Sequence, residues 1–117
     1  MPKRVMICQP MAGRSDEEIF DERCKVVEML DSYGYEVANS LFCFDDDTLK
    51  RKRVKSIPLY YLAESLRVMS GCDAVYFCEG WENARGCQIE YAAAEAYGLD
   101  LILWYPAELW MNTQKED

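Results

Sequence analysis

The segment "GWENARGCQIE", residues 80–90, places several chemically versatile side chains just before the carboxylate of Glu90. Gly80 and Gly86 permit a tight excursion of the backbone, and Trp81 offers a flat face on which a base or a sugar can stack. An Ala-rich helix follows, and Glu90 is expected about one turn into it. The helix dipole would hold the carboxylate ionised there, as a nucleophile or a hydroxyl-binding acceptor requires.

The same carboxylate also has a purely structural interpretation. An acidic residue in the first turn of a helix stabilises that helix through the macrodipole, with no ligand involved. On the residues alone, Glu90 is therefore either an ordinary helix-stabilising acid or a functional group in a cleft.

A second loop, "CQPMAGRSDEE", has a composition suited to anion binding. It joins a strand end to a helix N-terminus through Gly13, so that free backbone N–H groups and the adjacent Arg14 could hold a phosphate or a sugar. The acidic residues 16–18 count against a strongly anionic ligand. The alternative is a tight turn that leads into a well-capped helix.

Apolar runs and amphipathic segments alternate along the chain, which predicts a three-layer α/β fold with a central parallel sheet. The expected strands are residues 4–8, 35–40, 73–78 and 99–105, and the expected helices are 15–34, 58–71 and 87–97. Ligands bind outside the carboxyl ends of the strands in such sheets. We therefore expect the loops 9–14 and 79–87 to lie side by side at one edge.

The first expected helix opens with Ser15 and Glu18 in capping-box spacing. Its apolar stripe is predicted to contain Ile19, Phe20, Cys24, Val27 and Leu30.

Two other segments are predicted to be irregular. Residues 41–57 contain a triple Asp and the basic run 50–55 without a clear period, which indicates a long surface loop of mixed charge. A cationic lid over a phosphate is the alternative for the basic run. The tail, 106–117, is expected to form one helical turn and then fray.

Composition limits the classes of function. The 117 residues suit a single domain, residues 1–117, and the net charge of −8 argues against a nucleic-acid partner. No apolar run approaches the length of a membrane span or of a signal peptide, so we expect a cytoplasmic protein without a membrane partner. Six cysteines without Cys-x-x-Cys spacing, and no histidine, predict reduced, mostly buried thiols and no metal site. No cofactor is expected.

Three strings carry a resemblance to a known family: "CQPMAGRSDEEI", "PLYYLAESLRVMSGCDAVYFCEGWENARGCQIE" and "AAAEAYGLDLIL". They resemble the DUF4406 family, small proteins common in bacteria and phages, which is similar in turn to the nucleoside 2-deoxyribosyltransferase superfamily. The resemblance implies a flavodoxin-like, Rossmann-type fold, a homo-oligomer and a site for a nucleoside or nucleotide. In the superfamily's enzymes a glutamate attacks the anomeric carbon of deoxyribose, and Glu90 matches that glutamate.

The chain departs from the superfamily pattern at two positions. The first strand lacks the usual tyrosine, which only Tyr60 or Tyr61 could replace. Ser65 stands where the superfamily has an aspartate that helps to protonate the departing base, eight residues before Asp73. The proton must then come from another group, with Glu64, Glu82 or water as the candidates. Asp73, at the start of a strand, is interpreted as structural.

Together, these observations predict an enzyme that cleaves or transfers the N-glycosidic bond of a deoxynucleoside or deoxynucleotide. The alternative is a non-catalytic binder of a nucleotide or an ADP-ribose-like signal. The predicted site comprises Glu90 as the catalytic residue and, around the substrate, Gln9, Pro10, Met11, Gly13, Arg14, Ser65, Trp81, Glu82, Asn83, Arg85 and Gly86. Trp104, Tyr105 and Trp110 are predicted to form an oligomer interface, where aromatic residues are enriched.

Overall fold

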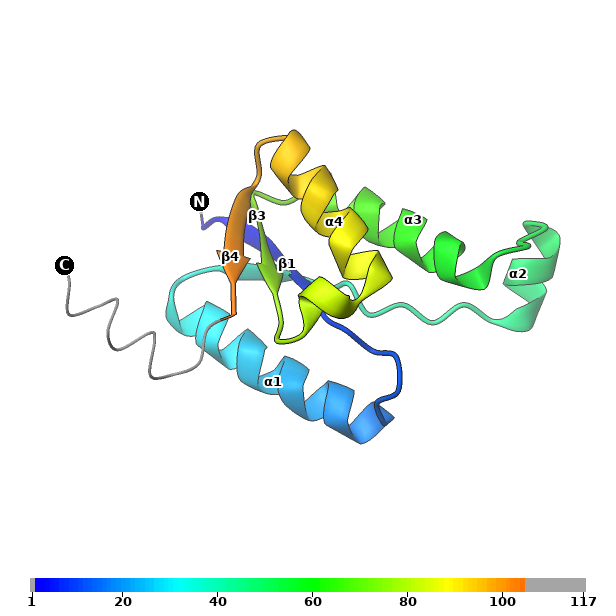
Figure 1. Ribbon diagram of the computed structural model, residues 1–117, viewed down its shortest axis with the longest axis horizontal. Coiled ribbons are helices and arrows are strands. Elements are labelled where there is room, and N and C mark those ends of the chain that lie inside the picture. Colours follow the sequence, from blue (N-terminus) through cyan, green and yellow to red (C-terminus); the bar gives the residue numbers. More distant parts are fainter. Residues whose placement is uncertain (1, 105–117) are drawn as a thin grey trace.

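The structure is a computed structural model that describes residues 2–104 of the chain. Four parallel strands form a central sheet in the order β2-β1-β3-β4 (Figure 1). Their bounds are Arg4–Cys8 for β1, Glu36–Ala38 for β2, Ala74–Phe77 for β3 and Asp100–Leu103 for β4. Each lies within a segment that the sequence predicts as a strand, so the parallel sheet is confirmed.

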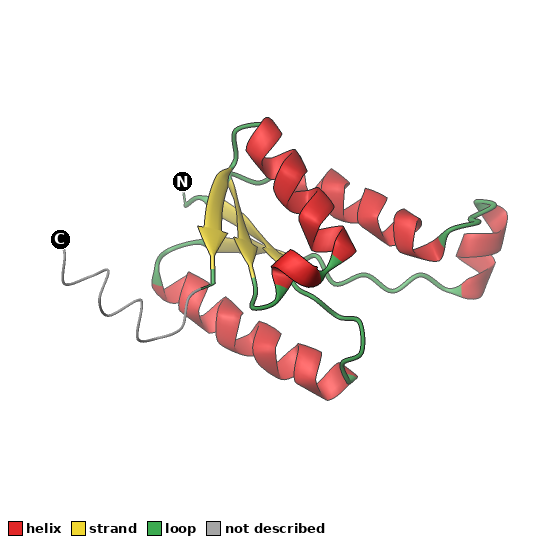
Figure 2. Ribbon diagram, in the orientation of Figure 1, coloured by secondary structure: helices red, strands yellow, loops and turns green. Residues whose placement is uncertain are grey.

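Helices cover both faces of this sheet (Figure 2). The first helix, α1 (Asp16–Ser32), lies on one face, whereas α3 (Ile57–Met69) and α4 (Arg85–Ala96) lie on the other. The predicted three-layer α/β arrangement is confirmed, and it is consistent with a flavodoxin-like, Rossmann-type fold.

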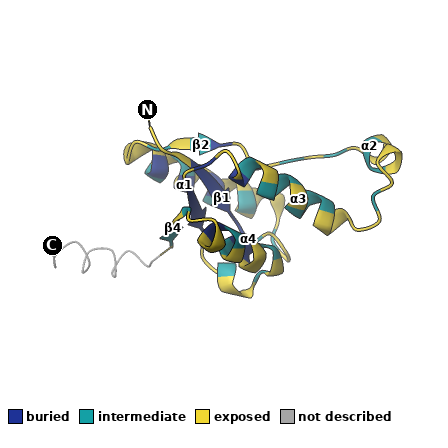
Figure 3. Ribbon diagram, turned by 90° about the horizontal axis from the view of Figure 1, so that it is seen from above, coloured by how far each residue is buried: buried dark blue, intermediate teal, exposed yellow. Residues whose placement is uncertain are grey.

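The core lies on both sides of the two central strands, which Figure 3 shows as buried. Val5 and Ile7 of β1 pack on the α1 side, whereas Met6 and Cys8 pack on the side of α3 and α4. Successive side chains of a strand point to opposite faces, so a strand covered on both sides must be apolar throughout. This requirement explains why the sequence of β1 is an uninterrupted apolar run after Arg4.

The start of α1 follows the sequence expectation, but its predicted apolar stripe is partly wrong. Leu30 is buried as expected, whereas Cys24 is exposed and Phe20 is 62% exposed. Val26 and Arg23 are buried instead. These three buried positions have the spacing of one helix face, and a charged residue occupies one of them. The predicted capping box between residues 15 and 18 is present.

Residues 41–57 contain a short helix, α2 (Asp46–Arg51), so the prediction of a continuous surface loop is wrong. The Asp45 side chain caps it by accepting a hydrogen bond from the backbone N–H of Thr48 at 2.7 Å. Acidic residues in its first turn and basic residues in its last turn complement the helix dipole. The mixed charges of this segment are thus arranged as in a capped helix.

The helix that carries Glu90 begins earlier than predicted. A 3-10 helix, η1 (Trp81–Asn83), leads into α4, which starts at Arg85 and not at Cys87. Glu90 therefore lies in the second turn of α4, and its predicted place in the first turn is wrong.

Three remaining expectations concern the ends of the sheet. Asp73 accepts a hydrogen bond from the backbone N–H of Arg4 at 2.8 Å, next to the amino end of β3, which supports its structural interpretation. Tyr105, Trp110 and the predicted turn at 106–117 lie outside the described residues. In residues 2–104, no helix has the length and apolar character needed to cross a bilayer.

Candidate functional site

The loops that follow β1 and β3 lie next to each other at the carboxyl edge of the sheet. β1 and β3 are paired neighbours, and the backbone N–H of Cys78 donates to the carbonyl of Cys8 at 2.9 Å. Gly80, with φ of 85°, is close enough to Pro10 that a Cβ added to the glycine would lie 3.9 Å from that ring. The predicted adjacency of loops 9–14 and 79–87 is therefore confirmed. The order of strand addition reverses at β1: β2 lies on one side of it, whereas β3 and β4 lie on the other, and open α/β sheets bind ligands at such a switch point.

A cavity of about 590 Å³ opens at this edge. Its volume is within the range that holds small-molecule ligands. The predicted site residues on its wall are Gln9, Pro10, Met11, Ser65, Asn83, Arg85, Gly86 and Glu90. The others, which are not on the wall, are Gly13, Arg14, Trp81 and Glu82. The basic run 50–55 does not line the cavity either.

Glu90 is a buried carboxylate on this wall, with only 8% of its surface exposed. Desolvation by burial raises the pKa of Glu90, and a hydrogen bond from the Cys8 thiol opposes that rise. Burial thus acts against the ionised form that the sequence leads us to expect, and Glu90 lies in the second turn of α4, further from the helix N-terminus than predicted.

Two thiols flank Glu90 on the wall. Cys8 and Cys87 are both buried. A hydrogen bond to Cys87 and burial together raise the pKa of Cys8, and the nearby Glu90 raises it further. Burial likewise raises the pKa of Cys78 to about 12. All the cysteines are free, and four of them are buried, which confirms the expectation of mostly buried, unbridged thiols. Protonated Cys8 acts as a hydrogen-bond donor here and not as a nucleophile.

Gln9 and Arg14 hold the first loop against α1. The Arg14 guanidinium donates to the Glu22 carboxylate at 2.7 Å and to the Pro10 carbonyl at 3.0 Å. The Gln9 amide donates to the same Glu22 oxygen and to the Ile19 carbonyl, both at 2.8 Å. The cation predicted to meet an anionic ligand is thus engaged by an acid of its own chain.

Arg23 is a wall residue that the sequence analysis did not identify. It projects from α1, is 8% exposed, and its Nε donates to the Gln9 Oε1 at 3.3 Å. Its terminal nitrogens donate to the Ser40 hydroxyl at 3.4 and 3.3 Å, and that hydroxyl donates to the Ile7 carbonyl at 3.2 Å. The sequence does contain a signal for this residue: Arg23 falls on the apolar face of the helix, and charged residues are almost never buried there unless they are paired.

Trp81 contacts the core of the protein at this end of the sheet. Its ring stacks on Tyr91 with centroids 4.6 Å apart and an interplanar angle of 14°, and it lies 5.2 Å from the ring of Phe77. One face of the indole that the sequence predicts to stack on a base is therefore covered by Tyr91. Glu82 and Asn83 are exposed in the same turn, and only Asn83 reaches the cavity wall.

The structure separates the groups that the sequence analysis names as a possible sugar-side tyrosine and as possible proton donors. Tyr61 lines the cavity, where its hydroxyl oxygen accepts a hydrogen bond from the backbone N–H of Phe44 at 3.1 Å, whereas Tyr60 does not line it. Glu64 pairs with Arg67 away from the wall, and Glu82 is also absent from it. Neither of the two carboxylates named as candidate proton donors therefore lines the cavity.

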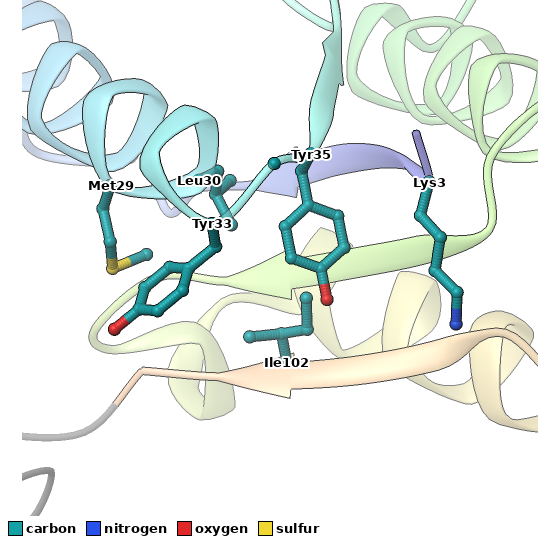
Figure 4. Close-up of a pocket in the computed structure, with 7 residues that line it drawn as sticks. Lys3, Met29, Leu30, Tyr33, Tyr35 and Ile102 are labelled. Atoms are coloured by element: carbon teal, nitrogen blue, oxygen red, sulfur yellow. The ribbon is translucent and has the colours of Figure 1, made fainter. Parts of the chain in front are cut away.

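A second cavity, of about 470 Å³, lies between the C-terminal end of α1 and β4, on the face of the sheet that α1 covers (Figure 4). Tyr33 and Tyr35 come from the end of α1 and the turn after it, Ile102 comes from β4, and Lys3 stands at the far side. Lys3 forms an ion pair with Asp100 at 2.9 Å. The residues that line this cavity include no acid, so the carboxyl-edge cavity is the better candidate for chemistry.

The residues 2–104 contain no group of three or more Cys, Asp or Glu side chains arranged to hold a metal ion. Comparison with known proteins gives no match among curated proteins and none among solved structures. The model of one family, described as a domain of unknown function (DUF4406), matches residues 3–103. That match spans both loops of the cavity and all the described strands and helices, and the chain therefore belongs to the DUF4406 family.

Proposed function

We propose that the protein is a nucleoside 2-deoxyribosyltransferase-like enzyme that cleaves or transfers the N-glycosidic bond of a deoxynucleoside or deoxynucleotide. The observation that carries this proposal is the buried Glu90 carboxylate on the wall of a ligand-sized cavity at the carboxyl edge of the sheet. A carboxylate at attack distance from an oxocarbenium-like carbon is the arrangement that retaining glycosidases use.

In the proposed reaction, a Glu90 oxygen forms a bond to the anomeric carbon of deoxyribose while the bond between that carbon and the base nitrogen breaks. The base leaves with the electron pair of the broken bond and takes up a proton, for which water in the cavity is the accessible source. A second base, or water, then attacks the glycosyl ester and releases Glu90. Ionised Glu90 is required, so its raised pKa sets the lower pH limit of the reaction.

Two observations also favour a second candidate, a non-catalytic binder of a nucleotide or an ADP-ribose-like signal. Ser65 lies on the wall where the superfamily's enzymes have an acid. Burial also favours the neutral form of Glu90, and a neutral carboxyl group binds sugar hydroxyls but is a poor nucleophile. In this alternative Glu90 is a hydrogen-bonding group for the ligand.

Incubation with a panel of deoxynucleosides and their 5′-monophosphates, followed by chromatography for released base, separates the two candidates. An enzyme releases base from at least one member of the panel, and adding a second free base distinguishes transfer from hydrolysis. A protein that binds a member of the panel in calorimetry but releases no base is the binder.

We also propose that the protein forms a homo-oligomer. Trp104, at the end of β4, keeps 36% of its surface exposed in the single chain. Large aromatic side chains of this kind are enriched where subunits meet.

A further inference from the structure

Arg23 is a buried cation without an acidic partner. Its side chain is 8% exposed, and among residues 2–104 it forms no ion pair. The neighbouring acid, Glu22, directs one carboxylate oxygen to Arg14 and Gln9. The contacts of Arg23 are instead to the uncharged side chains of Gln9 and Ser40, at 3.3–3.4 Å.

Such an arrangement is costly unless something compensates the charge. Removing a charged group from water costs free energy, and hydrogen bonds to neutral partners offset only part of that cost. Burial accordingly lowers the pKa of Arg23. A guanidinium has five donors, and the three that the structure uses here leave others available.

Arg23 lies where its charge can meet a ligand. Arg23 and Ser40 both line the carboxyl-edge cavity, whose wall also carries Glu90. Ser40 is itself held by its hydrogen bond to the Ile7 carbonyl, and Gln9 is held by α1, so the guanidinium is fixed by groups that are fixed themselves. A rigid guanidinium with N–H donors left over suits the oxygens of a phosphate group.

We propose that Arg23, positioned by Ser40, forms an anion subsite that binds the phosphate of a phosphomonoester, so that the ligand of this cavity is a nucleoside 5′-monophosphate. This inference rests on the proposed function, because it assigns the sugar of that ligand to Glu90 in the same cavity. Arg14, which the sequence favours for an anion, is held by Glu22 and does not line the cavity.

The test compares binding of matched pairs, each deoxynucleoside and its own 5′-monophosphate, with binding of inorganic phosphate as a minimal probe. The proteins are the unmodified chain, Arg23→Met, Arg23→Lys and Ser40→Ala. Arg67→Met is the matched control, because Arg67 is an exposed arginine that pairs with Glu64 outside the cavity. Calorimetry measures affinity, and chromatography of released base is recorded on the same samples.

The unmodified protein should bind a 5′-monophosphate at least ~10-fold more tightly than its nucleoside, since hydrogen bonds to charged groups are worth that much or more. Arg23→Met should remove this preference and leave the affinity for the nucleoside within about 3-fold. Arg23→Lys should keep part of the preference because it keeps the charge without the planar fork. Arg67→Met should leave the preference unchanged.

The inference is overturned if the unmodified protein binds nucleoside and monophosphate equally and does not bind phosphate, a result that needs no variant. It is also overturned if Arg23→Met retains the full preference. If Arg23→Met does not fold, Arg23→Lys and Ser40→Ala decide, and an undiminished preference in both overturns the subsite.

Binding of monophosphates through Arg23 without release of base would support the subsite and contradict the glycosidic reaction. Release of base at equal rates from nucleosides and monophosphates would support the glycosidic reaction and contradict the subsite.

Discussion

The Cys8 thiol at the end of β1 and the Glu90 carboxylate of α4 share the wall of the carboxyl-edge cavity, and both side chains are buried, at 2% and 8% exposed. The thiol is the group that counteracts desolvation at Glu90: burial raises the pKa of the carboxyl group, and the hydrogen bond from the thiol lowers it. The balance between these two effects decides how much of Glu90 is ionised near neutral pH.

Replacing Cys8 by alanine should shift the pH dependence of base release. Cys8→Ala removes the hydrogen bond that favours the carboxylate, so the acid limb of the pH–rate profile should move to higher pH. Cys8→Ser keeps a donor and should leave the limb closer to that of the unmodified protein. Measuring kcat/KM against pH for the three proteins tests this, and an unmoved limb in Cys8→Ala would show that the thiol does not influence Glu90.

Glu90→Gln should increase stability at neutral pH. The pKa of Glu90 is raised in the folded state above the ordinary value of 4.5, so its contribution to stability is full below pH 4.5 and is lost as the pH rises through the raised pKa. Glutamine has no such charge to bury. Thermal unfolding should therefore give a higher Tm than the unmodified protein at pH 7, with the difference shrinking toward pH 4.

The control for this comparison is Glu95→Gln, on the exposed side of the same helix. It should show no comparable gain at pH 7, because Glu95 is not buried. A Glu90→Gln protein whose Tm follows that of the unmodified chain at every pH would mean that burial does not penalise the ionised carboxylate.

Gly80→Ala should destabilise the loop between β3 and η1. Gly80 adopts φ of 85°, which L-residues rarely tolerate, although a Cβ there would make only an ordinary contact with the Pro10 ring at 3.9 Å. The cost should be about 1 kcal/mol. Gly86 has no positive φ and lies at the start of α4, so Gly86→Ala should leave the free energy of unfolding unchanged or slightly higher. Urea denaturation of both variants measures the difference, and equal costs would argue against conformational strain as the cause.

The proposed self-association predicts a mass above that of one chain. Light scattering at micromolar concentration should give a multiple of 13.6 kDa. Trp104→Ala should reduce that mass if the exposed indole is part of the contact, whereas Tyr97→Ala, at the C-terminal end of α4, serves as an exposed aromatic control. A mass of 13.6 kDa across the concentration range would contradict the proposal.

Much of the fold was predictable because the physical signals are local. The uninterrupted apolar runs at 5–8 and 74–78 indicate strands buried on both faces, and the alternation with helices implies parallel pairing. Adjacent loops at the carboxyl edge follow from that topology. The helix at residues 46–51 was missed because its signal is a cap and a charge gradient, with no apolar stripe to support it.

The candidate site was less predictable because burial and side-chain direction depend on packing. Glu90 was found from its loop and its position, but its raised pKa follows from removal of solvent, which no spacing reveals. Arg23 was missed because the buried face of a helix is predicted from the spacing of its apolar residues. A charged residue on that face is not part of the apolar pattern, so it is not recognised as buried. Trp81 was assigned to the ligand, and only the geometry of α4 shows that Tyr91 covers one of its faces.

The most direct test of the central claim is the rate of base release by Glu90→Ala, measured beside the unmodified protein and the exposed control Glu95→Ala. If Glu90 is the nucleophile, its removal should lower turnover by at least ~10³-fold while Glu95→Ala remains active. If the protein only binds, neither protein releases base, and calorimetry should show that Glu90→Ala weakens nucleoside binding by about 1 to 3 kcal/mol. Unchanged turnover together with unchanged binding in Glu90→Ala would contradict the account.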